Sequence, residues 1–214
     1  MTIELIHADC LDVDWPQVDL VLADPPYGID YQSARRTDRT KWKPKIINDK
    51  KPFIAWIEKA YKSTNEGGAI ICFCRWDVEE VFKQELERVG YKIKSQIIWD
   101  KVIHGMGDLR GSFAPQHENA WFAVKGRFKF WNKRPHTIIK ENRVDAQKMT
   151  HPNEKPIGLY EKIIIPIVKE NGSIVDPFFG SCNSGQACIN TGRNFIGIEK
   201  DEKYYNIAKE RLTL

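Results

Sequence analysis

The residues between Val18 and Tyr27 constrain the fold more than any other stretch of this chain. An apolar run of strand length, Val18-Asp19-Leu20-Val21-Leu22-Ala23, leads directly into Asp24-Pro25-Pro26-Tyr27. Such a run between turn signals is typical of a strand buried on both faces of a sheet. Proline has a fixed φ and no N–H, so two prolines cannot continue a sheet ladder. The sequence therefore predicts a buried strand that ends in a rigid turn, with a carboxylate before the prolines and an aromatic ring after them. Taken alone, the turn also fits a plain strand end.

The rest of the chain alternates short apolar runs with amphipathic segments. Further strands are predicted at residues 3–7, 69–74, 93–99, 119–124, 173–176 and 194–198. Helices are predicted from about Pro52, from an Asp77 cap to a stop at Gly90, from the 151–156 segment to Pro166, toward Thr191-Gly192, and at the end of the chain. This alternation indicates one α/β domain over residues 1–214, with a doubly wound, mostly parallel sheet covered on both faces.

Composition narrows the class of protein. The 214 residues suffice for one sizeable core, and the formal net charge of +4 is mild. No apolar run approaches the length of a membrane span, and the amino-terminal residues do not resemble a signal peptide. The 5 cysteines are odd in number and lack Cys-x-x-Cys spacing, and the histidines show no metal-binding spacing. We therefore expect a cytoplasmic protein without a zinc site, a disulfide framework or another metal.

Three acids directly follow short apolar strands: Asp9, Asp176 and Glu199. In an open α/β sheet, ligands bind at the carboxyl ends of the strands, near the point where the strand order reverses. The loop after Asp176 is rich in glycine and serine and precedes a helix, but the acid at its start would repel a phosphate and suits a cation. Glu199 is placed to accept both hydroxyls of a ribose. A ligand with a ribose and a positive charge but no phosphate suggests S-adenosylmethionine, although another nucleotide ligand also fits this half of the chain.

Several separated motifs resemble one family. Asp24-Pro25-Pro26-Tyr27 resembles the catalytic motif of DNA methyltransferases that modify the exocyclic amino group of adenine or cytosine. Asp176-Pro177-Phe178-Phe179-Gly180-Ser181, followed by Phe195 to Glu199, resembles their S-adenosylmethionine-binding segment. The order, with the catalytic motif first and the cofactor motif last, is similar to the β-type, circularly permuted members. The chain looks like a small, phage- or prophage-like member of the kind found in restriction-modification. The resemblance implies a Rossmann-like methyltransferase sheet of about seven strands, one of them antiparallel.

The resemblance also implies roles for individual residues. Asp24, Pro25, Pro26 and Tyr27 would be catalytic, and DNA would bind with a flipped base or as a single strand. An aspartate before Pro-Pro-Tyr favours adenine N6, with cytosine N4 as the alternative. β-type relatives are commonly dimers, so a homodimer is a further expectation. The residues expected to bind the cofactor are Asp9, Cys10, Lys155, Asp176, Pro177, Phe178, Gly180, Ser181, Cys182, Ser184, Glu199 and Lys200.

Two basic clusters are candidates for contact with DNA phosphates. Arg35, Arg36, Arg39, Lys41, Lys43 and Lys45 surround Trp42, which is available for stacking on a base. Arg127 and Lys129 alternate with aromatic residues, so a strand here would place both on one face. For both clusters the plain alternative is a solvated surface.

Two features depart from the family pattern. Cys182 replaces a glycine that lets the backbone approach the cofactor, so we expect cofactor binding to be retained but weakened. Residues 101–150 form a short insertion that is the candidate target-recognition region. Alternative functions are an RNA adenine or protein amide methyltransferase, or a non-catalytic nucleic-acid-binding subunit with the same fold.

Overall fold

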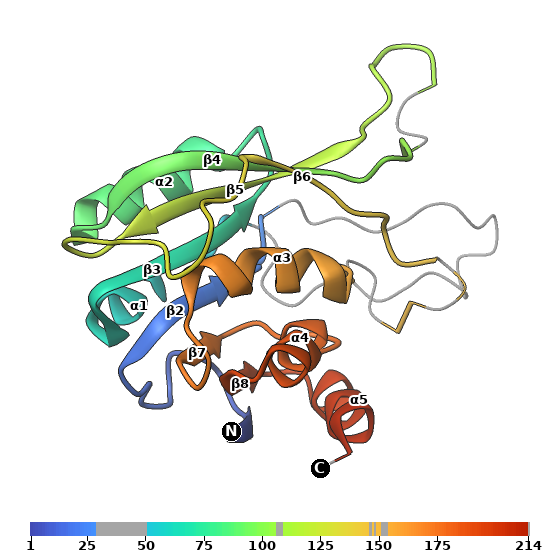
Figure 1. Cartoon of the computed structure of the whole chain (residues 1–214). Coiled ribbons are helices and arrows are strands. Elements are labelled where there is room, and N and C mark those ends of the chain that lie inside the picture. Colours follow the sequence, from blue (N-terminus) through green and yellow to red (C-terminus); the bar gives the residue numbers. More distant parts are fainter. Residues whose placement is uncertain (29–50, 106–108, 146, 148, 151–153, 214) are drawn as a thin grey trace.

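The computed structural model describes residues 1–28, 51–105, 109–145, 147, 149–150 and 154–213. Within these residues the chain forms eight strands and five helices (Figure 1). In chain order they are β1 (Ile3–His7), β2 (Val18–Ala23), α1 (Ile57–Ser63), β3 (Thr64–Cys74), α2 (Glu79–Val89), β4 (Lys92–Asp100), β5 (His117–Val124), β6 (Ile138–Lys140), α3 (Ile157–Ile167), β7 (Ser173–Asp176), α4 (Asn183–Thr191), β8 (Asn194–Glu199) and α5 (Glu202–Leu212).

All described strands belong to one sheet, in the order β1-β8-β7-β2-β3-β5-β4-β6. Only β5 runs antiparallel to its neighbours β3 and β4 among these strands, and the other adjacent pairs are parallel. This confirms the predicted doubly wound, mostly parallel sheet with one antiparallel strand. The sheet has one strand more than predicted, because the three residues of β6 pair with the end of β4 and are too few to give a sequence pattern.

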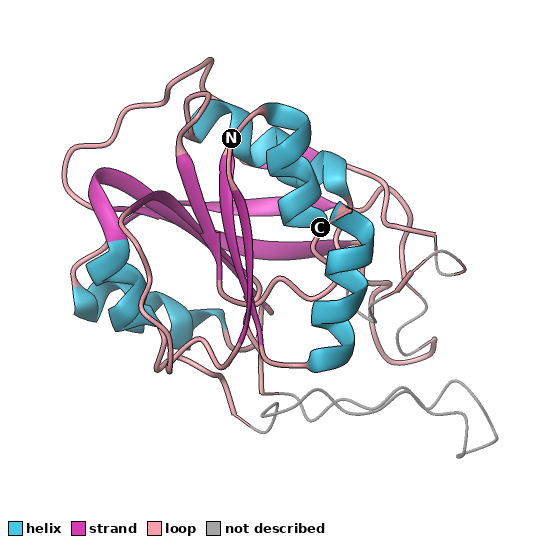
Figure 2. Cartoon of the chain, turned by 90° about the horizontal axis from the view of Figure 1, so that it is seen from below, coloured by secondary structure: helices cyan, strands magenta, loops and turns pink. Residues whose placement is uncertain are grey.

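Helices cover both faces of the sheet, which explains why its central strands are apolar throughout (Figure 2). Along β2, Leu20 and Leu22 belong to the core cluster that includes residues of α3, α4 and α5, whereas Val21 and Ala23 belong to the cluster that includes residues of α1 and α2. Successive side chains of a strand point to opposite faces, so a strand covered on both sides needs apolar residues at every position. The polar exception is Asp19, whose carboxylate accepts a hydrogen bond from the Ser173 backbone N–H at 3.0 Å.

The last strands of the chain lie in the middle of the sheet. β7 pairs with β2 through Leu20↔Ile174 and Val21↔Val175, and β8 lies between β7 and β1. Figure 1 shows these orange and red strands beside the blue β2. The carboxyl ends of β2 and β7 therefore lie at the same edge of the sheet. Asp24 follows β2 at that edge, and Asp176 is the last residue of β7.

Several predicted boundaries are wrong. The first helix begins at Ile57 rather than near Pro52, and Asp77 does not cap α2, because its carboxylate binds Arg75 instead. Pro166 lies inside α3 rather than beyond its end. β3 starts at Thr64, so it includes the two glycines that we expected to precede it.

The 101–150 range is not a separate insertion in space, because it contributes β5 and β6 to the sheet. Its described residues outside the sheet are the segment between β4 and β5 and the segments on either side of β6. Within the described part of the chain, no helix is long and apolar enough to cross a membrane.

Candidate active site

The candidate catalytic turn, Asp24-Pro25-Pro26-Tyr27, holds the Asp24 carboxylate between two donors. The Tyr27 hydroxyl donates a hydrogen bond to Asp24 Oδ1, and the Lys155 ammonium binds Asp24 Oδ2. Burial, with Asp24 and Glu118 nearby, raises the pKa of the Tyr27 hydroxyl, so it stays a donor at neutral pH. The backbone carbonyl of Pro26 accepts a hydrogen bond from the Phe53 N–H at 3.2 Å. The two prolines and these contacts fix the position of the Asp24 carboxylate.

Lys155, which the sequence grouped with the cofactor loop, thus contacts the Asp24 turn in this structure. The sequence also missed its second partner, Glu118, whose Oε2 lies 3.3 Å from the Lys155 nitrogen. Glu118 lies at the start of β5. Because β5 is antiparallel, its first residues reach the edge at which β2 and β3 end. The one signal in the sequence was an acid directly before the strand predicted at residues 119–124, and nothing in that signal showed its partner.

Asp176 begins the candidate cofactor loop at the adjacent strand end. Its carboxylate accepts hydrogen bonds from the Phe178 backbone N–H at 2.9 Å and from the Ser184 hydroxyl at 2.6 Å. Burial raises the pKa of Asp176 to about 7, although these two hydrogen bonds act in the opposite direction. The group is therefore close to half protonated at neutral pH, and a cation placed beside it would favour the charged form.

Glu199 fastens the loop from the end of the next strand. Its carboxylate accepts hydrogen bonds from the backbone N–H of Gly180 at 3.0 Å and of Asp201 at 2.8 Å. Burial raises the pKa of Glu199. Gly180 has a φ of 52°, and Ser181 and Pro177 are buried behind the loop. The half-buried Phe178 ring meets the Trp56 and Phe53 rings edge-on, with centroids 5.3 and 6.0 Å apart. The loop and the catalytic turn are thus packed against a shared aromatic cluster.

Cys182 lies directly before α4 in a left-handed conformation, with a φ of 61° and a ψ of 33°. This conformation explains the glycine of the family pattern, because a residue with a Cβ adopts it at a cost of about 1–2 kcal/mol. The Cys182 side chain is completely buried. A Cβ added to Gly185 would lie 2.6 Å from Cys182 Sγ, so Gly185 leaves the room that the sulfur occupies. The side chain is part of the core cluster that also contains Ala187, Cys188 and Leu212.

Asp9 and Lys200 come from opposite ends of the sequence and form an ion pair of 2.7 Å. They meet because β1 pairs in parallel with β8, up to His7↔Glu199. Burial alone would raise the pKa of Asp9, but the hydrogen bond from the Leu11 N–H and the charge of Lys200 outweigh burial and lower the pKa. Cys10 is buried, and its carbonyl accepts a hydrogen bond from Trp15 Nε1 at 2.9 Å. Lys200, after β8, lies two strands from β2, and Asp9, after β1, lies three strands from it, at the same edge of the sheet as Asp24.

Of the two basic clusters, the structure describes the position of Arg127 and Lys129. The cluster from Arg35 to Lys45, with Trp42, lies outside the described residues. Arg127 and Lys129 are exposed, but they follow β5. The last residue of β5, Val124, pairs with Ala69 of β3 and not with Cys74 at the end of β3. Figure 1 shows this segment at the opposite end of the sheet from the tips of β2 and β3. Residues 125–130 form no strand, yet the predicted alternation holds, since Phe128 and Phe130 pack on Phe122. Their position counts against contact with DNA bound at Asp24.

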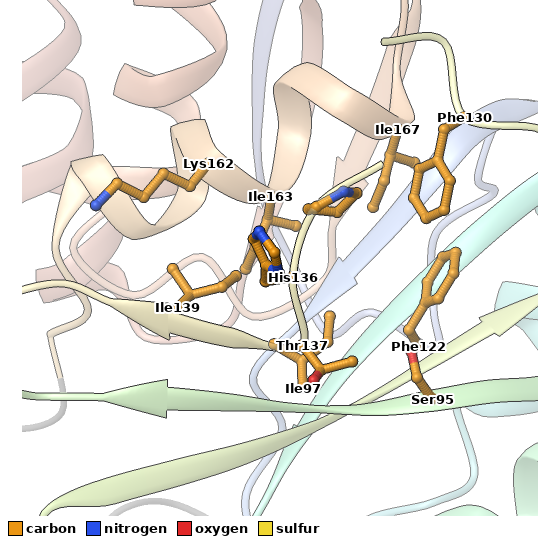
Figure 3. A pocket seen from close by; sticks show the side chains of 11 residues that line it. Ser95, Ile97, Phe122, Phe130, His136, Thr137, Ile139, Lys162, Ile163 and Ile167 are labelled. Atoms are coloured by element: carbon orange, nitrogen blue, oxygen red, sulfur yellow. The ribbon is translucent and has the colours of Figure 1, made fainter. Parts of the chain in front are cut away.

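A cavity between α3 and the β4–β6 side of the sheet lies outside this site (Figure 3). Its walls contain none of the predicted site residues. They are mostly apolar, with His136 and Lys162 among them: Ser95, Ile97, Phe122, Phe130, Pro135, His136, Thr137, Ile139, Lys162, Ile163 and Ile167.

A family model described as DNA methylase, covering N6 and N4 methyltransferases, matches residues 18–210. The chain belongs to this DNA methylase family. The match includes both the Asp24 turn and the loop after Asp176, so the two halves of the candidate site are features of one methylase fold.

Individual relatives agree with the family match. The DNA methylase is 28% identical to the type II methyltransferase M2.DpnII of Streptococcus pneumoniae, covering 97% of this chain and 88% of the relative. It is 27% identical to the putative methylase YubD of Escherichia coli K12, over the same shares of the two chains. The crystal structure of an M1.HpyAVI–SAM complex has a TM-score of 0.77 and 27% identity, over 98% of this chain and all of that chain. The cytosine-N4-specific PvuII methyltransferase shares the fold, with a TM-score of 0.77 at 14% identity, over 99% and 86% of the two chains.

Proposed function

We propose that this DNA methylase transfers the methyl group of S-adenosylmethionine to the exocyclic N6 of adenine in DNA. The observation that carries the proposal is the pairing of β2 with β7. It brings the end of the strand before Asp24 beside the strand that ends in Asp176, so an acceptor base and a methyl donor can meet between them. The aspartate that precedes Pro25-Pro26-Tyr27 favours adenine over cytosine.

The residues at the β7 and β8 ends fit S-adenosylmethionine. Asp176 ends β7, where the loop begins, and Glu199 ends the neighbouring β8. These two acids would attract a sulfonium and an α-ammonium group and would repel a phosphate. Glu199 is placed to accept ribose hydroxyls, and Asp9 with Lys200 lies beyond it at the β1 end. When bound, S-adenosylmethionine supplies an activated methyl group.

The residues of the catalytic turn would orient the target amine. An exocyclic amine is a poor nucleophile because its lone pair is delocalised into the ring. Asp24 and the Pro25 carbonyl could each accept one N–H, which would direct the lone pair toward the methyl carbon. The nitrogen forms its bond to that carbon as the carbon–sulfur bond breaks, the electron pair stays on sulfur, and one amine proton is lost to solvent. A base stacked in a duplex cannot reach the turn, so we infer that it is flipped out or enters from a single strand.

The test is methyl transfer by Asp24 variants. Asp24→Ala and the isosteric Asp24→Asn are expected to lower the rate of DNA methylation at least about 100-fold, because they remove the acceptor that orients the amine. The dissociation constant for S-adenosylmethionine, from calorimetry, should change by less than about threefold, since Asp24 lies outside the cofactor loop. Asp14→Ala, at an exposed aspartate between β1 and β2, is the control. Normal turnover by Asp24→Asn would contradict the assignment.

The base is decided by mass spectrometry of nucleosides from treated nucleic acid. We expect N6-methyladenine from DNA. N4-methylcytosine alone would show the alternative specificity, and methylation of RNA but not DNA would show the alternative substrate. Binding of S-adenosylmethionine and DNA without any methylated product would indicate a non-catalytic subunit.

A further inference from the structure

Lys155 is a charged residue enclosed in the protein beside the catalytic turn. Its side chain is 2% exposed, and its ammonium group binds Asp24 and lies 3.3 Å from Glu118 Oε2. It also lies 4.5 Å from the centroid of the Phe73 ring. Burial alone would lower the pKa of Lys155, but Asp24 and Glu118 outweigh it and raise the pKa. The lysine is therefore charged, and it depends on both carboxylates for that charge.

Glu118 lies between Lys155 and a second, more exposed lysine, Lys101. Its Oε1 lies 2.6 Å from the ammonium group of Lys101, and its side chain is half-buried. Burial alone would raise the pKa of Glu118, but Lys155 and Lys101 outweigh it and lower the pKa. Two carboxylates thus flank one enclosed ammonium group. Lys101, whose side chain is 22% exposed, pairs with Glu118 from the outer side, so the two acids and the two lysines balance in charge.

The backbone of Lys155 is fixed by the cofactor half of the molecule. Its carbonyl accepts a hydrogen bond of 2.8 Å from the Asn183 side-chain amide, at the first residue of α4. The next residue, Pro156, has a φ of −70° and starts α3. Figure 1 shows α3 lying across the sheet toward the edge where β2 ends. Lys155 therefore extends from the cofactor half, and its side chain ends on the carboxylate of the catalytic half.

We propose that Lys155 and Glu118 are positioning residues for methyl transfer, in which Lys155 fixes the Asp24 carboxylate and Glu118 offsets the charge of Lys155. This inference rests on the proposed function. As the carbon–nitrogen bond forms, positive charge develops on the amine, and the Asp24 carboxylate that accepts its N–H stabilises that charge. Without Glu118, the charge of Lys155 would act on Asp24 alone and make Asp24 a weaker acceptor. Without Lys155, Asp24 would lose the contact that holds one of its two oxygens.

The experiment measures single-turnover methylation of DNA at saturating S-adenosylmethionine, together with the cofactor dissociation constant and the melting temperature. Lys155→Met is expected to slow the methyl-transfer step about 100-fold, because the carboxylate is no longer held in place. The isosteric Glu118→Gln should slow it at least about tenfold, with little change in the KM for DNA. In neither variant should cofactor affinity fall more than about threefold.

The double variant separates a shared role from two independent ones. If Glu118 acts through Lys155, the variant that carries both substitutions should transfer methyl groups no more slowly than Lys155→Met alone. A double variant whose loss of rate is the product of the two single losses would overturn that part of the proposal. The matched control is the ion pair between Lys162 of α3 and Glu141, which follows β6; the Lys162 nitrogen and the Glu141 carboxylate oxygen lie 2.8 Å apart. Lys162→Met and Glu141→Gln should leave the rate unchanged.

The outcomes also distinguish this inference from the proposed function. If the native protein transfers no methyl group to DNA, the proposed function fails before any variant is compared. If the native protein is active and Glu118→Gln retains its full single-turnover rate, the positioning role is wrong while the function stands. Because Glu118→Gln conserves shape, it decides the matter even if Lys155→Met does not fold.

Discussion

At the scale of single residues, the buried Asp176 carboxyl couples cofactor binding to pH. Burial raises the pKa of Asp176 in the free protein to about 7, and a bound cation would lower it again. Binding therefore releases a proton, so affinity should rise as the pH rises through 7 and then level off. We expect the dissociation constant for S-adenosylmethionine to fall about tenfold between pH 6 and pH 8.

Calorimetry across this pH range tests the prediction for Asp176. Asp176→Asn should bind more weakly and lose most of the pH dependence, whereas Glu170→Gln, at an exposed acid before β7, should keep it. If Asp176→Asn kept the slope, another group would be responsible for it.

Cys182 gives a second prediction at this scale. Its side chain is buried in the core against Gly185, so Cys182→Gly should change the affinity for S-adenosylmethionine by less than about threefold. This result would contradict the weakening that the sequence led us to expect for the cysteine. A tenfold or greater gain in affinity for the glycine variant, measured by calorimetry, would show that the side chain does hinder the cofactor.

Sequence patterns identified the acids at the strand ends but not all of their partners. The positions of Asp24, Asp176 and Glu199 follow from apolar runs that end in an acid, which is local information. The contact between Lys155 and Asp24 spans 131 residues, and that between Arg211 and Glu154 spans 57. Such pairs depend on the order of strands and helices in space, which no local pattern contains.

At the scale of elements, a polar cluster joins the ends of three helices. Glu154, just before α3, accepts hydrogen bonds from the Asn183 amide of α4 and from Arg211 of α5, each at 2.9 Å. Arg211 also binds the Asn183 side-chain oxygen. The Glu154 side chain is only 3% exposed, so removing Arg211 takes an ion pair and its hydrogen bonds away from a buried cluster.

Arg211→Ala should therefore lower the free energy of unfolding by about 2–4 kcal/mol. Lys209→Ala, at an exposed position of the same helix, should change it by less than about 0.5 kcal/mol. Urea unfolding of both variants measures the difference. Equal stability of the two variants would mean that the Arg211 cluster contributes little to holding the helices together.

Element boundaries were predicted less well than the elements themselves. The apolar face from Phe53 to Tyr61 suggested a helix from Pro52, yet Phe53 uses its N–H to bind the Pro26 carbonyl, and α1 starts only at Ile57. Asp77 had the spacing of a cap, but Arg75 lies close enough to bind its carboxylate. In both cases a contact outside the expected helix replaced the local preference.

At the scale of the whole molecule, Asp24 and Asp176 lie at one edge of the sheet, and the two basic clusters are expected to lie at different distances from that edge. Arg127 and Lys129 lie at the opposite edge, and we propose that the cluster from Arg35 to Lys45 follows the DNA phosphates. Replacing Lys41 and Lys43 by alanine should reduce the slope of log affinity against log salt concentration by about 2.

Alanine at Arg127 and Lys129 should leave that salt slope unchanged. Fluorescence anisotropy of a labelled duplex at several salt concentrations measures both slopes. A loss of slope only in the Arg127 and Lys129 variant would reverse the proposed position of the DNA.

The pairing of β2 with β7 also has a consequence for the growing polypeptide on the ribosome. About 150 residues separate the end of β2 from the start of β7, which at roughly 5–20 residues per second corresponds to about 8–30 s of synthesis. During that time β2 has a neighbour on one side only, and the strands that carry Asp176 and Glu199 do not yet exist. A nascent chain of this order therefore cannot methylate anything until its last third has emerged, and one side of its central strand stays open to wrong partners until then.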